Sequence, residues 1–204
     1  AGTVTGLDDT EAVTISDTTA AASDLNTLNG ETTGVVNAAS ITTLTGTIAD
    51  TQASYDANTA GTISGLGNEA VTLSDTGSIV ASTITDVASE TSGTVTVNSG
   101  TTTLTGTIAE AQAVYDATNV AIDADEAVIT SDTGTVSALA ITNLDFETTG
   151  VVTLNAGITT LTGTIAQVQA AFDANDAGTV TGLDDTEAVT ISDTTAAASD
   201  LNTL

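Results

Sequence analysis

One 19-residue stretch is written three times in this chain, and its spacing limits the possible folds more than any other feature. It starts at Ile41 as ITTLTGTIADTQASYDANT, at Thr101 as TTTLTGTIAEAQAVYDATN and at Ile158 as ITTLTGTIAQVQAAFDAND. The starts at 41, 101 and 158 give steps of 60 and 57 residues. Repetition at a nearly fixed period is typical of stacked repeat proteins, in which each unit packs mainly on its neighbours.

The charge of the chain excludes several partners. Its 204 residues include 27 Asp and Glu but no Lys, Arg or His, which gives a formal net charge of −27. Nucleic acids and anionic membrane surfaces bind proteins through Lys and Arg, so we expect no nucleic-acid partner. No apolar run approaches the roughly 20 residues that span a bilayer, so membrane insertion is not expected either.

Composition alone leaves disorder and folding in competition. A high net charge and few aromatic residues favour disorder. However, 40% of the residues are hydrophobic, and many are Val, Ile and Leu in alternating runs. This alternation predicts packed strands with one buried face. The chain has no cysteine, so no disulfide framework supports the fold.

The repeat divides into two half-repeats. First halves begin near residues 1, 60, 120 and 177, second halves begin near 33, 92 and 149, and residues 177–204 repeat residues 1–28 letter for letter. Residues 13–28 can be laid over residues 42–57 without a gap, which suggests that the two halves are alike. We therefore expect a single repeat array over residues 1–204, an excerpt of a longer chain with a 176-residue period. Its coils are predicted at about 1–32, 33–59, 60–91, 92–119, 120–148, 149–176 and 177–204.

Within a coil the apolar period changes from that of a strand to that of a helix. Thr43-Leu44-Thr45 alternates with period two, whereas Ile48, Gln52 and Tyr55 recur at three and four residues. Helix starts are predicted at Thr47, Thr107 and Thr164, because each is followed three residues later by Asp50, Glu110 or Gln167. The helix ends are predicted at Asn58, Asn119 and Asn175.

These elements predict a mainly β fold. The expected architecture is a parallel β-solenoid of about seven coils, each with two short strands and one short helix. Parallel strands lie about 4.8 Å apart, whereas a helix is about 10 Å wide, so the stack should be curved or superhelically twisted. We also expect Leu44, Leu104 and Leu161 to form one inward ladder of the core.

No catalytic set is visible. His, Cys and Lys are absent, and the Ser and Thr hydroxyls have no base beside them except carboxylates, so we expect no enzyme and no required cofactor. The aspartate of the repeated Ser-Asp-Thr has two interpretations: a helix cap or Asx-turn, or a calcium ligand. The candidate calcium ligands are Asp8, Asp9, Glu11, Asp17, Asp75, Asp132 and Asp193.

Two other repeated features have alternative interpretations. Gln52, Gln112 and Gln169 recur beside the apolar side of the predicted helix, where each amide either bonds the backbone of a neighbouring coil or faces solvent. Thr-x-Thr recurs in the predicted strands. Threonine there is either a β-branched strand former on an outer face or part of a flat ice-binding ladder.

The segments DTTAAASDLNTL, TTGVVNAASITTLTGTIAD and AGTVTGLDDTEAVTISD resemble the tandem repeats of very large, acidic, Cys-free surface and adhesin-like proteins of bacteria, including marine cyanobacteria. The resemblance covers the whole chain and implies an extracellular or cell-surface location. We therefore expect a repetitive extracellular structural protein that forms a filament, a sheath or stalk, or a surface layer. Its expected partners are like repeats, docked end to end, and divalent cations. The alternatives are a calcium-stiffened adhesin stalk and an ice-binding Thr-rich solenoid.

Overall fold

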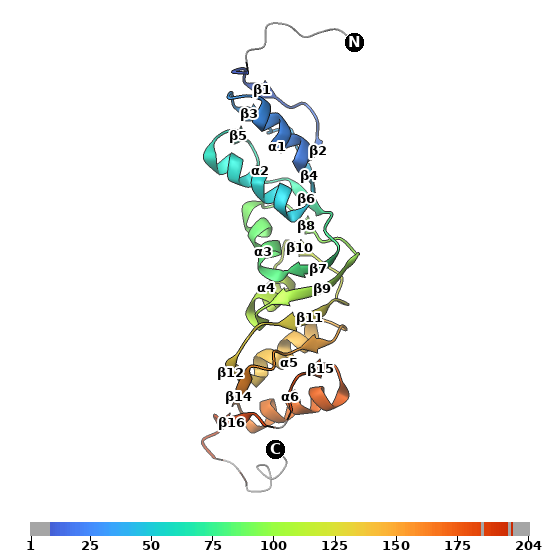
Figure 1. Ribbon diagram of the computed structural model, residues 1–204, viewed down its shortest axis with the longest axis vertical. Coiled ribbons are helices and arrows are strands. Elements are labelled where there is room, and N and C mark those ends of the chain that lie inside the picture. The colour runs from blue at the N-terminus through green and yellow to red at the C-terminus, as the bar shows by residue number, and fades with distance from the viewer. Residues whose placement is uncertain (1–8, 185, 196, 198–204) are drawn as a thin grey trace. The chain divides into compact units, whose positions relative to one another are not determined.

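The chain folds as an α/β repeat in which parallel strands alternate with helices (Figure 1). The structure is a computed structural model that describes residues 9–184, 186–195 and 197. Of these described residues, 35% are helical and 28% lie in strands. The expectation of a mainly β solenoid is therefore wrong. Every coil with a described helix devotes 9 to 13 residues to it, because the Ala-rich segment after the last strand favours a full helix.

First-half and second-half coils differ in their number of strands. The coils near residues 60 and 120 have three strands before the helix, whereas the second-half coils have two. The first-half coils contain β1 (Val13–Thr14), β2 (Thr19–Ala21) and α1 (Ala22–Glu31); β5 (Ile63–Ser64), β6 (Ala70–Leu73), β7 (Gly77–Val80) and α3 (Ala81–Glu90); β10 (Val120–Ala121), β11 (Ala127–Thr130), β12 (Gly134–Ser137) and α5 (Ala138–Glu147); and β15 (Val180–Thr181) and β16 (Ala188–Ile191). The second-half coils contain β3 (Val36–Asn37), β4 (Thr43–Gly46) and α2 (Ile48–Ala60); β8 (Val95–Thr96), β9 (Thr101–Gly106) and α4 (Ile108–Asp116); and β13 (Val152–Thr153), β14 (Ile158–Gly163) and α6 (Ile165–Ala177).

The chain forms two compact units, and each contains two complete sheets. The first unit comprises the described part of Ala1–Asp75 together with Thr83–Asn98 and Ala117–Ile122; the second comprises Thr76–Ser82, Ser99–Asp116 and the described part of Asp123–Leu204. In the first unit the strand orders are β1-β3-β5 and β10-β8-β6-β4-β2. In the second they are β15-β13-β11-β9-β7 and β12-β14-β16. All of these pairings are parallel.

Strands that pair are not equivalent strands of successive coils. In the sheet β7-β9-β11-β13-β15, a third strand is followed by two second strands and then by two first strands. The other five-stranded sheet, β2-β4-β6-β8-β10, follows the same rule. A first-half coil carries one strand more than a second-half coil. Along each five-stranded sheet, the place of the paired strand within its coil therefore changes from third to second to first. The gapless overlay of the two halves missed this extra strand.

The repeated leucines are buried but do not form one ladder. Leu44, Leu104 and Leu161 are each fully buried, which confirms their place in the core. Each belongs to a different sheet, where its register partners are Ala20 and Val71, Ile79 and Val128, or Val136 and Val189, respectively. The expectation of a single leucine ladder is wrong, because the extra strand moves each leucine into the next sheet.

The helix starts were predicted correctly, but the helix ends were not: α4 ends at Asp116, before the predicted Asn119, and the other two helices run past the predicted residues. Thr47 and Thr164 are the N-caps of α2 and α6, and Thr107 accepts the equivalent bond from the Glu110 amide at the start of α4. Helices α2 and α6 end at Gly61 and Gly178, both in the left-handed conformation, which glycine adopts without steric cost. The predicted end residues Asn58 and Asn175 lie inside the last turn and accept bonds from the Leu66 and Leu183 amides.

Candidate functional site

The recurring aspartates accept hydrogen bonds across the boundary between a second-half coil and the first-half coil that follows. Asp75 Oδ2 accepts a hydrogen bond from the backbone N–H of Ile48, the first residue of α2, at 2.7 Å. Asp132 does the same for Ile108 of α4, at 2.7 Å, and Asp193 for Ile165 of α6, at 2.7 Å. The capping interpretation therefore fits the geometry, but each aspartate caps the helix of the preceding coil rather than its own.

Each of these helix starts is capped twice. Besides the aspartate of the next coil, a threonine at the helix start accepts a bond from an amide in the first turn: Thr47 from Asp50, Thr107 from Glu110 and Thr164 from Gln167. The first N–H groups of a helix have no partner within it and carry partial positive charge. In a chain without cationic side chains, these groups are the natural partners of its carboxylates.

The other candidate calcium ligands do not join these aspartates. Asp8 lies outside the described residues. Asp9 is exposed, with φ at 66°, and its carbonyl oxygen accepts bonds from the amide and hydroxyl of Thr33. Glu11 is half-buried, and Asp17 is exposed at the edge of a groove. Within the part of the chain that the structure describes, no group of three or more acidic side chains is placed to hold a metal ion.

A second repeated contact closes the boundary from a first-half coil to the following second-half coil. The hydroxyl of Thr32 donates to the Glu11 carbonyl at 2.6 Å and accepts a bond from the Gly34 amide at 3.0 Å. The same pattern joins Thr91 and Gly93 to Glu69, and Thr148 and Gly150 to Glu126. We call this arrangement the threonine clamp. The three glycines are required because a Cβ on each would lie 2.3 Å from the glutamate carbonyl oxygen.

A buried tyrosine and glutamate also join a second-half coil to the next first-half coil. The Tyr55 hydroxyl donates to Glu69 Oε1, and both side chains are 1% exposed. Glu69 Oε2 accepts bonds from the amides of Gly67 and Asn68, at 2.9 and 3.1 Å. In the second unit, Tyr115 and Glu126 form the same pair with a longer separation of 3.5 Å.

Burial shifts the ionisation of these groups. Desolvation is the main cause that raises the pKa of Tyr55, and the bond to Glu69 adds to it. Desolvation raises the pKa of Tyr115 to about 12. It also raises the pKa of the Glu126 carboxyl, with a smaller contribution from the neighbouring charge of Asp125. The pKa of Glu110, in contrast, is lowered by the amide and hydroxyl bonds from Thr107.

Repeated sequence patterns mark the residues of these contacts. Glu69 and Glu126 belong to a Glu-Ala-Val that occurs in all four first-half coils, and the clamp belongs to a repeated Glu-Thr-(Ser/Thr)-Gly. Of this set, Glu11 is among the candidate calcium ligands, and none was predicted to be a buried contact between coils. Their constancy across coils, while Asp8-Asp9 becomes Gly67-Asn68, is the pattern that marks them as structural.

The glutamine and threonine rows have structural roles. Each repeated glutamine donates from Nε2 to the aspartate four residues later, at 3.3 Å for Gln52, 3.1 Å for Gln112 and 2.9 Å for Gln169. The amides therefore bond within their own helix and not to a neighbouring coil. In Thr-Leu-Thr, the second hydroxyl donates to a strand carbonyl of the preceding coil; these residues are Thr45, Thr105 and Thr162. These hydroxyls therefore bond each second-half coil to the coil before it.

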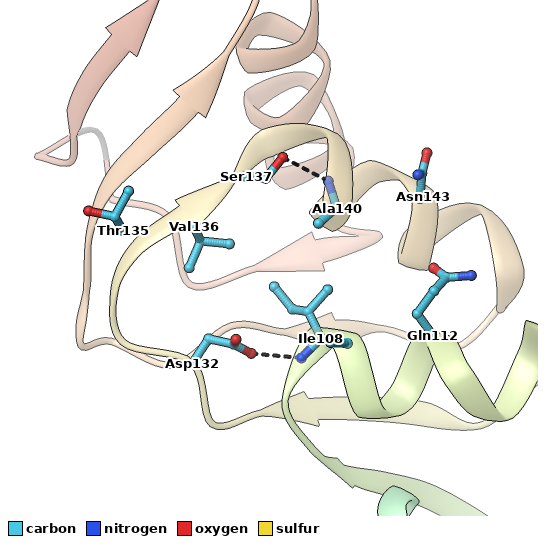
Figure 2. Close-up of a pocket in the computed structure, with 9 residues that line it drawn as sticks. Ile108, Gln112, Asp132, Thr135, Val136, Ser137, Ala140 and Asn143 are labelled. Carbon is cyan, nitrogen blue, oxygen red and sulfur yellow. Dashed lines mark hydrogen bonds between the residues drawn. The ribbon is translucent and has the colours of Figure 1, made fainter. Parts of the chain in front are cut away.

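A groove lies between α4 and the following coil. Figure 2 shows the residues that line it, and its volume is about 290 Å³. Its lining residues are Ile108, Ala109, Gln112, Asp132, Thr135, Val136, Ser137, Ala140 and Asn143. Asp132, the only ionisable group in this lining, is bonded to the Ile108 amide (Figure 2). The lining offers no nucleophile beside a base, and its apolar surface is the contact between two coils.

Comparison of the chain with models of protein families, with curated proteins and with solved structures finds no match. Among the described residues, no helix is both long enough and apolar enough to cross a membrane.

Proposed function

We propose that this chain is a repetitive structural protein of the cell exterior or cell surface, and that its coils continue end to end into a filament, a sheath or stalk, or a surface layer. The observation that carries the proposal is the repetition of boundary contacts. The aspartate cap occurs at three boundaries and the threonine clamp at three others. These repeated polar contacts hold the next coil in place.

The location outside the cell is supported by the resemblance to bacterial surface repeats, and the mode of lateral association follows from charge. A surface with a net charge of −27 and no cationic side chain repels a parallel copy of itself. Side-by-side bundling therefore requires divalent cations as bridges, whereas end-to-end contact uses backbone N–H groups. In this proposal calcium bridges the carboxylates of neighbouring filaments.

Electron microscopy of the full chain over a range of concentrations tests the proposal. We expect unbranched filaments of one width at high protein concentration. In millimolar calcium they should lie in bundles, and chelation should separate the bundles without shortening the filaments. Discrete particles of monomer size at every concentration and ionic strength would contradict the filament.

A further inference from the structure

The acidic side chains of this protein avoid its sheets. In the part of the chain that the structure describes, no strand contains an Asp or a Glu, although the sequence has 27 of them. Each helix in the same part contains two, and the other described carboxylates lie in the connections. The negative charge is therefore carried by helices and connections, and the outer faces of the sheets are uncharged.

The sheet β7-β9-β11-β13-β15 of the second unit has one buried and one outer face. Its buried row of register partners, each at most 6% exposed, consists of Ile79, Leu104, Val128, Val152 and Val180. Side chains alternate along a strand, so the residue after each of these points to the opposite face. We call this outer row the uncharged face; it consists of Val80, Thr105, Ile129, Thr153 and Thr181.

The uncharged face is open to solvent and partly aliphatic. Val80 and Ile129 are each 49% exposed, and Thr153 is exposed beside Ile129. Two of its hydroxyls already donate within the sheet, from Thr105 to the Ile79 carbonyl and from Thr181 to the Thr153 hydroxyl. Because these hydroxyls have partners inside the protein, covering the face removes little hydrogen bonding to water.

The first unit has an outer row of the same kind. In the sheet β2-β4-β6-β8-β10 this row consists of Ala21, Thr45, Thr72, Thr96 and Ala121. It is also without charge, and its last three residues are exposed. It contains no Val or Ile, so it has less apolar surface to bury. The uncharged face of the second unit is therefore the stronger candidate for a contact.

Charge selects the partner of this surface. A cationic partner is attracted to the carboxylates of the helices and connections and gains nothing from a surface without charge. A second copy of this chain has the opposite requirement, because it carries no Lys, Arg or His and is repelled wherever two acidic surfaces meet. Two copies meet at the lowest electrostatic cost with one uncharged face against another. Sheets can pack in this way, face to face and about 10 Å apart.

We propose that the uncharged face is the surface through which neighbouring copies touch side by side, while calcium bridges the carboxylates around it. This inference rests on the proposed bundling of filaments and names its contact surface. Five strands about 4.8 Å apart give a face only about 20 Å wide, so one pair of faces covers far less than the roughly 800 Å² per partner of a stable interface. Single contacts are therefore weak, and bundles depend on many of them acting together.

A carboxylate placed on the uncharged face tests its role in bundling. Ile129→Glu puts the charge in the middle of the row, and Leu139→Glu is the matched control, because Leu139 is apolar, 43% exposed and lies on α5. Both full-length variants have the same net charge. Pelleting in millimolar calcium gives the protein concentration at which bundles form. Like charges facing each other are strongly unfavourable, so we expect Ile129→Glu to raise this concentration about tenfold or more, and Leu139→Glu to change it less than about twofold.

Disulfide trapping measures the contact directly, because the chain has no cysteine of its own. Ile129 lies on the central strand of its sheet, so face-to-face packing brings the two copies of Ile129→Cys within bonding reach, whereas Leu139→Cys reports random collisions. In calcium and a mild oxidant, we expect Ile129→Cys to form dimers roughly tenfold faster than Leu139→Cys. Chelation of calcium should remove the difference.

The cysteine pair decides the proposal even if Ile129→Glu fails to fold, because cysteine is small and uncharged. Equal dimer formation by the two cysteine variants in calcium, or faster formation by Leu139→Cys, would overturn it. Wild-type filaments that bundle in calcium, together with equal cysteine rates, would leave the scaffold function standing without this contact surface. A wild type that never forms filaments, with faster dimer formation by Ile129→Cys, would contradict the scaffold alone.

Discussion

The hydroxyl of Tyr55 is the best place to measure what a coil boundary contributes to stability. Tyr55→Phe removes the donor to Glu69 Oε1 and leaves the shape of the ring unchanged. Glu69 is 1% exposed, so water cannot replace the donor at that oxygen. The other carboxylate oxygen keeps its bonds to the Gly67 and Asn68 amides. A bond to a charged group is worth about 1.5–3 kcal/mol, and we expect a loss of stability in that range.

The chain contains the reverse situation, which supplies the matched control. Phe172 stands where the other second-half coils have Tyr55 and Tyr115. The glutamate of the next coil, Glu187, has a buried Oε2 without a hydrogen-bond partner within the described structure. Phe172→Tyr should supply that donor and stabilise the protein by about 1 kcal/mol, less than the Tyr55 effect because Glu187 is only half-buried. Tyr115→Phe should lie between these cases, since its bond is 3.5 Å long.

Urea unfolding is the suitable assay, because guanidinium would also screen the net charge of −27. Thermal unfolding gives a second reading, with a shift of about 2–4 °C per kcal/mol for a chain of this size. Surface substitutions usually change the free energy of unfolding by no more than about 0.5 kcal/mol. If Tyr55→Phe changes it by no more than that, the hydroxyl does not stabilise the boundary between the coils. Destabilisation by Phe172→Tyr would show that the Glu187 carboxylate cannot accept a bond from a hydroxyl at position 172.

Two further predictions follow from named residues. Because burial raises the folded pKa of Glu126, folding favours its protonated form, so stability should rise as pH falls from neutral toward the ordinary glutamate range, before Glu110 loses its capping bonds. Burial also raises the pKa of Tyr115 to about 12, so folding favours the protonated phenol, and stability should fall above about pH 10, where the unfolded tyrosine ionises. The melting temperature measured against pH tests both the acid and the alkaline prediction. Gly93→Ala places a Cβ 2.3 Å from a backbone oxygen and should destabilise the protein by about 3 kcal/mol or more. Gly30→Ala is the control: Gly30 lies in α1 with open space around it, so alanine should stabilise the protein by about 0.5–1 kcal/mol. A neutral Gly93→Ala in urea unfolding would refute the clamp geometry, whereas a destabilising Gly30→Ala would contradict the open space at that position of α1.

The sequence was sufficient to predict what depends on neighbouring residues. Helix starts at Thr47 and Thr164 follow from local capping chemistry, and the burial of Leu44 follows from alternation within a strand. Parallel pairing of the coils follows from repetition. These features are set within a few residues or by the period itself, so tertiary contacts do not alter them.

The third strand of the first-half coils could not be predicted in the same way. In the first coil, β2 is Thr19-Ala20-Ala21, and alanine favours a helix. It is a strand because it pairs with β4, where Ala20 lies beside the fully buried Leu44. Local preference and tertiary pairing disagree there, and pairing prevails. Since this one strand sets the order of every sheet, missing it led to the wrong leucine ladder.

The absence of cationic side chains explains why the coil boundaries are alike. Within the chain, a carboxylate can be satisfied only by an N–H group or a hydroxyl. At the boundaries, Asp132 accepts a bond from the first N–H of α4, and Glu69 accepts bonds from two loop amides and a phenol. Amides are present whatever the side chains are, so the aspartate cap depends on where the neighbouring backbone runs and little on its sequence. The same cap therefore forms between any two successive coils whose backbones have this geometry, and it occurs at three boundaries of the chain. The chemistry that lets an entirely acidic chain fold is therefore the same at each of these boundaries, because it depends on backbone groups that every coil carries.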